Sequence, residues 1–153
     1  MMSCTDCRSR RDVLKIIAAL GFASLPVLFV DGVEAAAGQG SVQKYPFPAG
    51  DGVTIDRKQQ VIVVRSQGQI FAFNLSCPHE NTALKWLPKD NRFQCPKHES
   101  KYQPNGTFVS GRATRNMDRL AIRRDGNDLF VDLSHIIKSD TDATLWNAAA
   151  LAV

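Results

Sequence analysis

Cysteine and histidine are both scarce in this chain of 153 residues. It contains four cysteines and three histidines. Cys4 and Cys7 lie upstream of an apolar segment, so we expect them to stay outside the folded domain as incidental residues. The domain is then left with Cys77 and Cys95, and a histidine follows each of them within three residues. A cysteine paired with a histidine at two places is what a metal site requires.

Basic runs and aromatic residues are also few. The formal net charge is +4, no run of basic residues occurs, and aromatic residues make up 8% of the chain. These features argue against a nucleic-acid-binding surface. The excess stays at +4 from residue 38 onward, with 15 basic and 11 acidic residues. It is compatible with docking on an acidic redox partner and equally with an ordinary solvated surface.

The chain also lacks an apolar run of the length that usually crosses a membrane. Residues 16–30 are its most apolar segment, but they contain Pro26, and a span needs about 20 residues. The segment follows Ser9-Arg10-Arg11-Asp12-Val13-Leu14-Lys15. This stretch resembles a twin-arginine export signal, although Val13 stands where that signal usually has an aromatic residue.

Two outcomes follow for residues 1–37, which we expect to be a signal peptide or a membrane anchor. Small residues before Gly38 favour cleavage after Ala37 and release into the periplasm. Retention would instead leave residues 16–30 in contact with the inner membrane, with the domain on its periplasmic face. A short segment with a proline makes a poor span, so cleavage is favoured. We expect residues 38–50 to form a linker.

Short β-prone runs separated by turn signals fill the rest of the chain. The runs cover residues 53–55, 61–64, 69–74, 107–109, 120–122 and 129–133. They predict an all-β fold over residues 51–135, an antiparallel sandwich or barrel. In the tail, residues 136–153, Ser139 or Asp140 is placed to cap a short helix. We expect the apolar residues of the tail to pack on the domain: Leu145, Trp146 and Leu151.

Two segments carry the chemistry: Cys77-Pro78-His79 and, fifteen residues later, Cys95-Pro96-Lys97-His98. Each offers one thiolate and one imidazole. Structural zinc is one candidate, although zinc sites more often have Cys-x-x-Cys and His-x-x-x-His halves than mixed halves. A mononuclear catalytic metal would need an open position and a general base, and nothing in the sequence specifies one. The third candidate is a 2Fe–2S cluster with both cysteines on one iron and both histidines on the other.

The pattern Cys-x-His, fifteen residues, Cys-x-x-His resembles the Rieske iron–sulfur family in order and spacing. The resemblance spans residues 53–133 and implies a small subdomain in which two loops hold one 2Fe–2S cluster. Its implied ligands are Cys77, His79, Cys95 and His98. Ser100 and Tyr102 also match the second cluster loop of the cytochrome-complex members. There the serine hydroxyl donates to a bridging sulfide and the tyrosine hydroxyl to a cysteine sulfur, which raises the reduction potential.

Two features depart from the cytochrome-complex members of that family. Those proteins have one further cysteine in each loop, and the two cysteines form a disulfide. This chain has Glu80-Asn81-Thr82 in the first loop and Lys97 in the second, so that disulfide is excluded. Their proline-rich loop over the cluster corresponds here to Gly111-Arg112-Ala113-Thr114. Both departures distance the chain from the standard quinol-oxidising complex.

The resemblance implies an electron-transfer subunit rather than a stand-alone enzyme. Two neutral imidazoles in place of thiolates make the cluster easier to reduce, with potentials of about −150 to +300 mV, and we expect the middle or upper part of that range. The exposed edge would be His79 and His98, where a quinol could bind. Asn81, Leu84 and Trp86 would shield the cluster or form a docking surface, with core packing expected for Trp86, and we assign His135 no ligand role.

The export signal agrees with an iron–sulfur cluster, because cluster insertion requires folding before export and the twin-arginine route moves folded proteins. We expect a carrier between a quinol or a periplasmic dehydrogenase or oxidase and a cytochrome-type acceptor. It could be the iron–sulfur subunit of a complex like ubiquinol–cytochrome c reductase. The alternative is the small subunit of a periplasmic molybdenum oxidoreductase similar to arsenite oxidase. A zinc-stabilised binding module without redox activity is the alternative from a different class.

Overall fold

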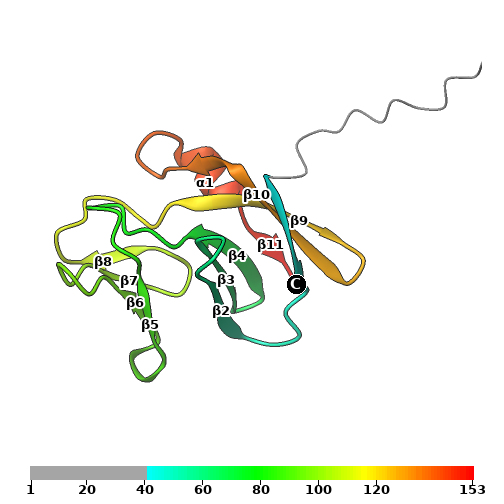
Figure 1. Ribbon diagram of the computed structural model, residues 1–153, viewed down its shortest axis with the longest axis horizontal. Coiled ribbons are helices and arrows are strands. Elements are labelled where there is room, and N and C mark those ends of the chain that lie inside the picture. Colours follow the sequence, from blue (N-terminus) through cyan, green and yellow to red (C-terminus); the bar gives the residue numbers. More distant parts are fainter. Residues whose placement is uncertain (1–40) are drawn as a thin grey trace, which may run out of the picture. The chain divides into compact units, whose positions relative to one another are not determined.

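The computed structural model describes residues 41–153, which form a mostly β fold (Figure 1). The expected antiparallel all-β fold with a short C-terminal helix is confirmed. The predictions about the export signal, its cleavage, Cys4 and Cys7 fall outside the described residues. Within residues 41–153, no helix is long and apolar enough to cross a membrane.

The larger of two sheets has seven antiparallel strands. Its main path runs through β1 (Val42–Pro46), β10 (Asp128–Ile137), β9 (Arg119–Asp125), β4 (Gln69–Asn74), β3 (Val61–Ser66) and β2 (Gly52–Asp56). The seventh strand, β11 (Leu151–Ala152), pairs with β4. The chain therefore returns at its C-terminal end to the middle of the sheet.

The smaller sheet lies between β4 and β9 in the sequence. Its four strands are β5 (Lys85–Leu87), β6 (Arg92–Gln94), β7 (Lys101–Tyr102) and β8 (Phe108–Ser110), with the 3-10 turn η2 (Pro88–Asp90) between β5 and β6. Helix α1 (Ala143–Ala148) follows β10. Figure 1 shows the smaller sheet beside β2, β3 and β4.

Strands β3 and β4 are buried on both faces, which explains their nearly continuous apolar sequences. Side chains of a strand alternate between its faces, so each strand contributes to two apolar clusters. On one face, Val61 and Val63 belong to the same cluster as Leu129 of β10. On the other face, Ile62 belongs to the same cluster as Phe93 of β6. The β3–β4 hairpin thus contributes one face to each of the two apolar clusters.

Some elements differ from the expected ones. The stretch 38–50, expected as a linker, contains β1, which pairs with β10 over five residues. Helix α1 is capped by Asp142, whose Oδ1 accepts a hydrogen bond from the Leu145 amide at 2.8 Å, so the expected cap at Ser139 or Asp140 was wrong. Strands β5 and β7 have three and two residues, too few for a periodic pattern to be visible in the sequence.

The C-terminal segment is tied to the domain by Trp146 and the buried Arg119. The Trp146 Nε1 donates to the Met117 carbonyl at 2.7 Å, and Arg119 Nη1 donates to the Trp146 carbonyl at 2.6 Å. The guanidinium carbon lies 3.6 Å from the centre of the Trp146 ring. Burial lowers the pKa of Arg119 to about 10, so it stays charged at neutral pH and keeps its attraction to the ring face. Of the tail residues expected to pack on the domain, Trp146 is buried and Leu151 packs against the core, but the expectation was wrong for Leu145, which is exposed.

We predict that Trp146→Ala lowers the free energy of unfolding by about 3–4 kcal/mol, because it removes a large buried side chain together with the cation–π contact. Leu145→Ala is the matched control, since Leu145 is 48% exposed in the same helix and should change stability by no more than about 0.5 kcal/mol. Thermal unfolding followed by circular dichroism measures both. Equal effects of the two substitutions would contradict the role given to Trp146.

Candidate metal centre

The two segments that carry the expected ligands have the same backbone conformation. In each, the cysteine amide donates to the carbonyl five residues later: Cys77 to Thr82 at 2.8 Å and Cys95 to Ser100 at 2.9 Å. In each, the cysteine carbonyl accepts from the amide four residues later, at 2.9 Å from Asn81 and 3.0 Å from Glu99. We call residues 77–82 loop 1 and residues 95–100 loop 2.

The last turn of each loop needs a left-handed residue. Asn81 has φ of 54° and Glu99 has φ of 55°. Asparagine adopts this conformation with little strain, whereas glutamate does so at a cost. The two loops are therefore equivalent in backbone geometry but unequal in strain.

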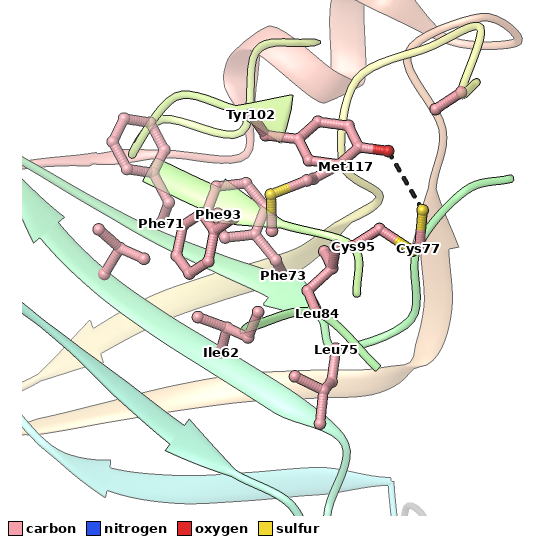
Figure 2. Close-up of a cluster of buried hydrophobic side chains, with 12 residues drawn as sticks. Ile62, Phe71, Phe73, Leu75, Cys77, Leu84, Phe93, Cys95, Tyr102 and Met117 are labelled. Carbon is pink, nitrogen blue, oxygen red and sulfur yellow. Dashed lines mark hydrogen bonds between the residues drawn. The ribbon is translucent and has the colours of Figure 1, made fainter. Parts of the chain in front are cut away.

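The strand before each loop positions its cysteine. Strand β4 precedes loop 1 and β6 ends directly before loop 2. Phe73 of β4 and Phe93 of β6 are fully buried and pack edge to face, with ring centres 6.3 Å apart. Cys77 and Cys95 are 0% and 1% exposed and lie at one edge of the same apolar cluster (Figure 2). Burial is the main cause that raises the pKa of the Cys77 thiol.

The two histidines of the loops are partly exposed and lie against each other. The Nδ1 atoms of His79 and His98 lie 3.0 Å apart, and the rings are nearly perpendicular. Their side chains are 25% and 18% exposed. The structure thus brings the two expected imidazoles together at the surface, while the two expected thiols, two and three residues earlier in the chain, are buried in one apolar cluster.

Tyr102, expected to bond a cysteine sulfur, lies beside the Cys77 thiol. Its hydroxyl oxygen is 3.4 Å from the Cys77 sulfur (Figure 2). Burial, followed by the hydrogen bond to Cys77, raises the pKa of Tyr102 well above its ordinary value. The phenol therefore keeps its proton, and it is the donor whenever Cys77 is a thiolate.

Ser100 is fully buried and is held by a segment that the sequence analysis treated only as a departure. Its Oγ accepts a hydrogen bond from the Ala113 amide at 3.0 Å, and its side chain also hydrogen-bonds Tyr102. Gly111 has φ of 115°, and a Cβ there would lie 2.4 Å from the Ser100 Cα. Residues 111–114 therefore pack against loop 2, and only glycine allows the close approach. Gly111 and Ala113 are site residues that sequence reasoning missed.

Glu80 and Lys97, the residues that exclude a disulfide, form an ion pair across the loops. The Lys97 Nζ lies 2.6 Å from Glu80 Oε2. The hydrogen bond from Lys97 lowers the pKa of the Glu80 carboxyl. The same carboxylate is 3.9 Å from His79 Nε2 and 3.8 Å from His98 Nδ1. The exposed edge therefore contains two imidazoles and the Glu80–Lys97 ion pair.

The other residues considered for the site are spread more widely. Leu84 is fully buried in the apolar cluster, and Trp86 packs on Phe93 with ring centres 4.8 Å apart. Asn81 is exposed. His135 is exposed on β10, outside both loops. The core packing expected for Trp86 is therefore confirmed, and Leu84 belongs to the core rather than to a docking surface.

The donor set fits a binuclear cluster better than a single ion. Among residues 41–153, the side chains close enough to share one ion are His79, Glu80 and His98, with donor atoms within 4.8 Å of one another. Neither thiol belongs to that group, whereas one tetrahedral zinc ion would need all four donors around one point. Two buried thiols and two converging imidazoles instead match a unit with a sulfur-ligated iron and a nitrogen-ligated iron.

We predict that Glu99→Gly raises the free energy of unfolding by about 0.5–1 kcal/mol. Relief of the left-handed strain exceeds the entropy that glycine adds to the unfolded chain. Asn81→Gly, at the equivalent position of loop 1, is the control and should change stability by less than about 0.5 kcal/mol, because asparagine tolerates this conformation. Thermal unfolding of the purified protein measures both. A loss of stability in Glu99→Gly would mean that the Glu99 side chain has a role of its own.

Known proteins share this region. A family model described as Rieske [2Fe-2S] domain matches residues 39–124. The cytochrome b6-f complex iron-sulfur subunit of Chlorobaculum thiosulfatiphilum is 28% identical over 74 residues, which are 48% of this chain and 41% of that protein. The subunit of the same name from Prochlorococcus marinus subsp. pastoris is 39% identical over 72 residues, which are 46% of this chain and 40% of that protein.

A solved structure is also similar in sequence. It is the plasma membrane Rieske protein PetC3 of the cyanobacterium Synechocystis PCC 6803, with 29% identity over 54% of this chain and 86% of that chain, at a TM-score of 0.45. The chain spans about two fifths of the length of the two curated relatives. The family model covers more than half of the chain. The protein is therefore a member of the Rieske [2Fe-2S] domain family, which implies a Rieske 2Fe–2S cluster.

Proposed function

We propose that the protein is a one-electron carrier whose cluster is held by Cys77 and Cys95 on one iron and by His79 and His98 on the other. The observation that carries this proposal is the separation of the four donors into a buried thiol pair and a surface imidazole pair. Thiolates in the apolar interior are shielded from water, and the imidazoles remain accessible to a partner.

The electrostatic surroundings support a raised reduction potential. Two ferric ions, two sulfides and two thiolates sum to zero charge, and neutral imidazoles add none, so reduction leaves a single negative charge. Tyr102 is 3.4 Å from the Cys77 sulfur and keeps its proton. The Ser100 hydroxyl is a second donor group, held by hydrogen bonds with the Ala113 amide and the Tyr102 side chain. Donors of this kind favour the reduced form of a cluster.

The exposed histidine pair is the proposed point of electron exchange. His79 and His98 are the only expected ligands with exposed side chains. We propose a quinol or a periplasmic oxidoreductase as the donor and a cytochrome-type protein as the acceptor. The relatives are iron–sulfur subunits of cytochrome b6-f complexes by name, which supports a place in a complex of the ubiquinol–cytochrome c reductase kind. The small subunit of a periplasmic molybdenum oxidoreductase is the alternative.

The proposed location is the periplasm or the periplasmic face of the inner membrane, reached in folded form by the twin-arginine route. The motif at Arg10-Arg11 supports this proposal. Residues 1–37 would be the cleaved signal or a retained anchor.

We predict that the dithionite-reduced protein gives a Rieske electron paramagnetic resonance signal. His98→Cys should keep a cluster but lower its reduction potential by on the order of 100–300 mV, because a thiolate adds negative charge. His135→Ala is the control, since His135 lies outside both loops, and its potential should equal that of the wild type. Stoichiometric zinc without the signal would refute the cluster, and an unchanged potential in His98→Cys would refute the ligand assignment.

We predict that Tyr102→Phe and Ser100→Ala each lower the reduction potential while keeping the signal. A donor that favours the reduced state by about 1 kcal/mol corresponds to roughly 40 mV for one electron. Tyr45→Phe is the matched control, because the Tyr45 hydroxyl bonds Asp56 at 3.1 Å, away from the loops. Protein-film voltammetry measures the potentials, and a shift in Tyr45→Phe as large as that in Tyr102→Phe would contradict the assigned role.

A further inference from the structure

Loops 1 and 2 carry their functional side chains in opposite order. Counted from the cysteine, the second and third residues are His79 and Glu80 in loop 1 but Lys97 and His98 in loop 2. The loops have the same backbone hydrogen bonds, so the two positions are equivalent in each. When the loops face each other, imidazole meets imidazole at 3.0 Å and carboxylate meets ammonium at 2.6 Å.

The ion pair is the non-ligand link between the loop tips. The backbone hydrogen bonds of each loop close within that loop. The described residues hold two cysteines, both free and both at ligand positions, so no disulfide joins the loops there. On the inner side, Phe73 and Phe93 hold the preceding strands together. On the outer side, the link beyond the proposed ligands is Lys97 with Glu80.

The pair also controls the charge beside the imidazoles. Glu80 lies within 4 Å of a ring nitrogen of both His79 and His98. Lys97 holds this carboxylate and neutralises it. Loss of Lys97 would leave a negative charge beside the histidine pair, and loss of Glu80 would leave a positive one.

We propose that Glu80 and Lys97 are a positioning pair, which closes loop 1 onto loop 2 at the histidine edge and keeps that edge electrically balanced. The proposal rests on the proposed function of the two loops as the cluster site. In this proposal the pair holds the loops together whichever residue carries which charge. Its effect on the reduction potential, by contrast, depends on the sign of the charge that is lost.

The experiment compares four variants with the wild type: Glu80→Gln, Lys97→Gln, the double variant of these two, and a charge-swapped variant that combines Glu80→Lys with Lys97→Glu. The control is Asp90→Asn, which breaks a similar exposed ion pair of 3.0 Å with Arg92 outside the loops. The first readout is the half-life of the reduced Rieske signal in excess chelator. The second is the reduction potential.

The expected results differ between the two readouts. Both single variants and the double variant should lose the cluster about two- to five-fold faster, the range for an exposed ion pair. The charge-swapped variant should lose the cluster at a rate within two-fold of the wild type, and Asp90→Asn should leave that rate unchanged. High salt should speed loss in the wild type but not in the double variant. The potential should instead follow charge, lower in Lys97→Gln than in the wild type and higher in Glu80→Gln.

Potentials that follow charge with wild-type loss rates in all variants would overturn the proposal. Hydrogen-exchange mass spectrometry of the loop peptides provides a readout that needs no cluster, because the Asn81 and Glu99 amides are bonded inside the loops. They should exchange faster in the double variant than in the wild type, and equal exchange would also overturn the proposal. A wild type without a Rieske signal would refute the proposed function. The comparison of hydrogen-exchange rates would still decide the role of the pair.

Discussion

The site depends on one packing contact, that of Phe73 in β4 with Phe93 in β6. Both rings are fully buried, with centres 6.3 Å apart, and each strand leads into one of the two loops. The contact therefore sets how the loops face each other. Gly106 supports it, because a Cβ at that turn would lie 2.4 Å from the Phe73 ring. A larger residue there would displace the ring and, through β4, loop 1.

The same apolar cluster divides the proposed ligands by chemistry. The thiols of Cys77 and Cys95 are enclosed with Tyr102, so water is excluded from the sulfur side and the phenol has a sulfur as its partner. The imidazoles remain partly exposed. A cluster held in this way would have one iron shielded from water and one accessible iron. The proposed point of electron exchange, at the histidines, thus rests on burial as well as on the ligand types.

The two loops show how one backbone design can serve different side chains. Their hydrogen bonds are equivalent, yet loop 1 places its histidine second after the cysteine and loop 2 places it third. This reversal brings the two histidines together when the loops face each other. It also explains why Glu80 and Lys97 meet, since they fill the remaining two positions. Salt screens an ion pair but does not weaken a disulfide, so the contact between the two loops should depend on ionic strength.

The sequence by itself predicted the 2Fe–2S cluster and the main strands. The mixed Cys/His halves, Ser100 and Tyr102 are local patterns of type and spacing, and β3 and β4 are visible as apolar runs because burial on both faces leaves no polar positions. Only the tertiary structure decided the short strands, the contact of Ala113 with Ser100, and the pairing of Glu80 with Lys97. These features join segments that are separate in the chain, and their geometry depends on packing that residue spacing does not encode.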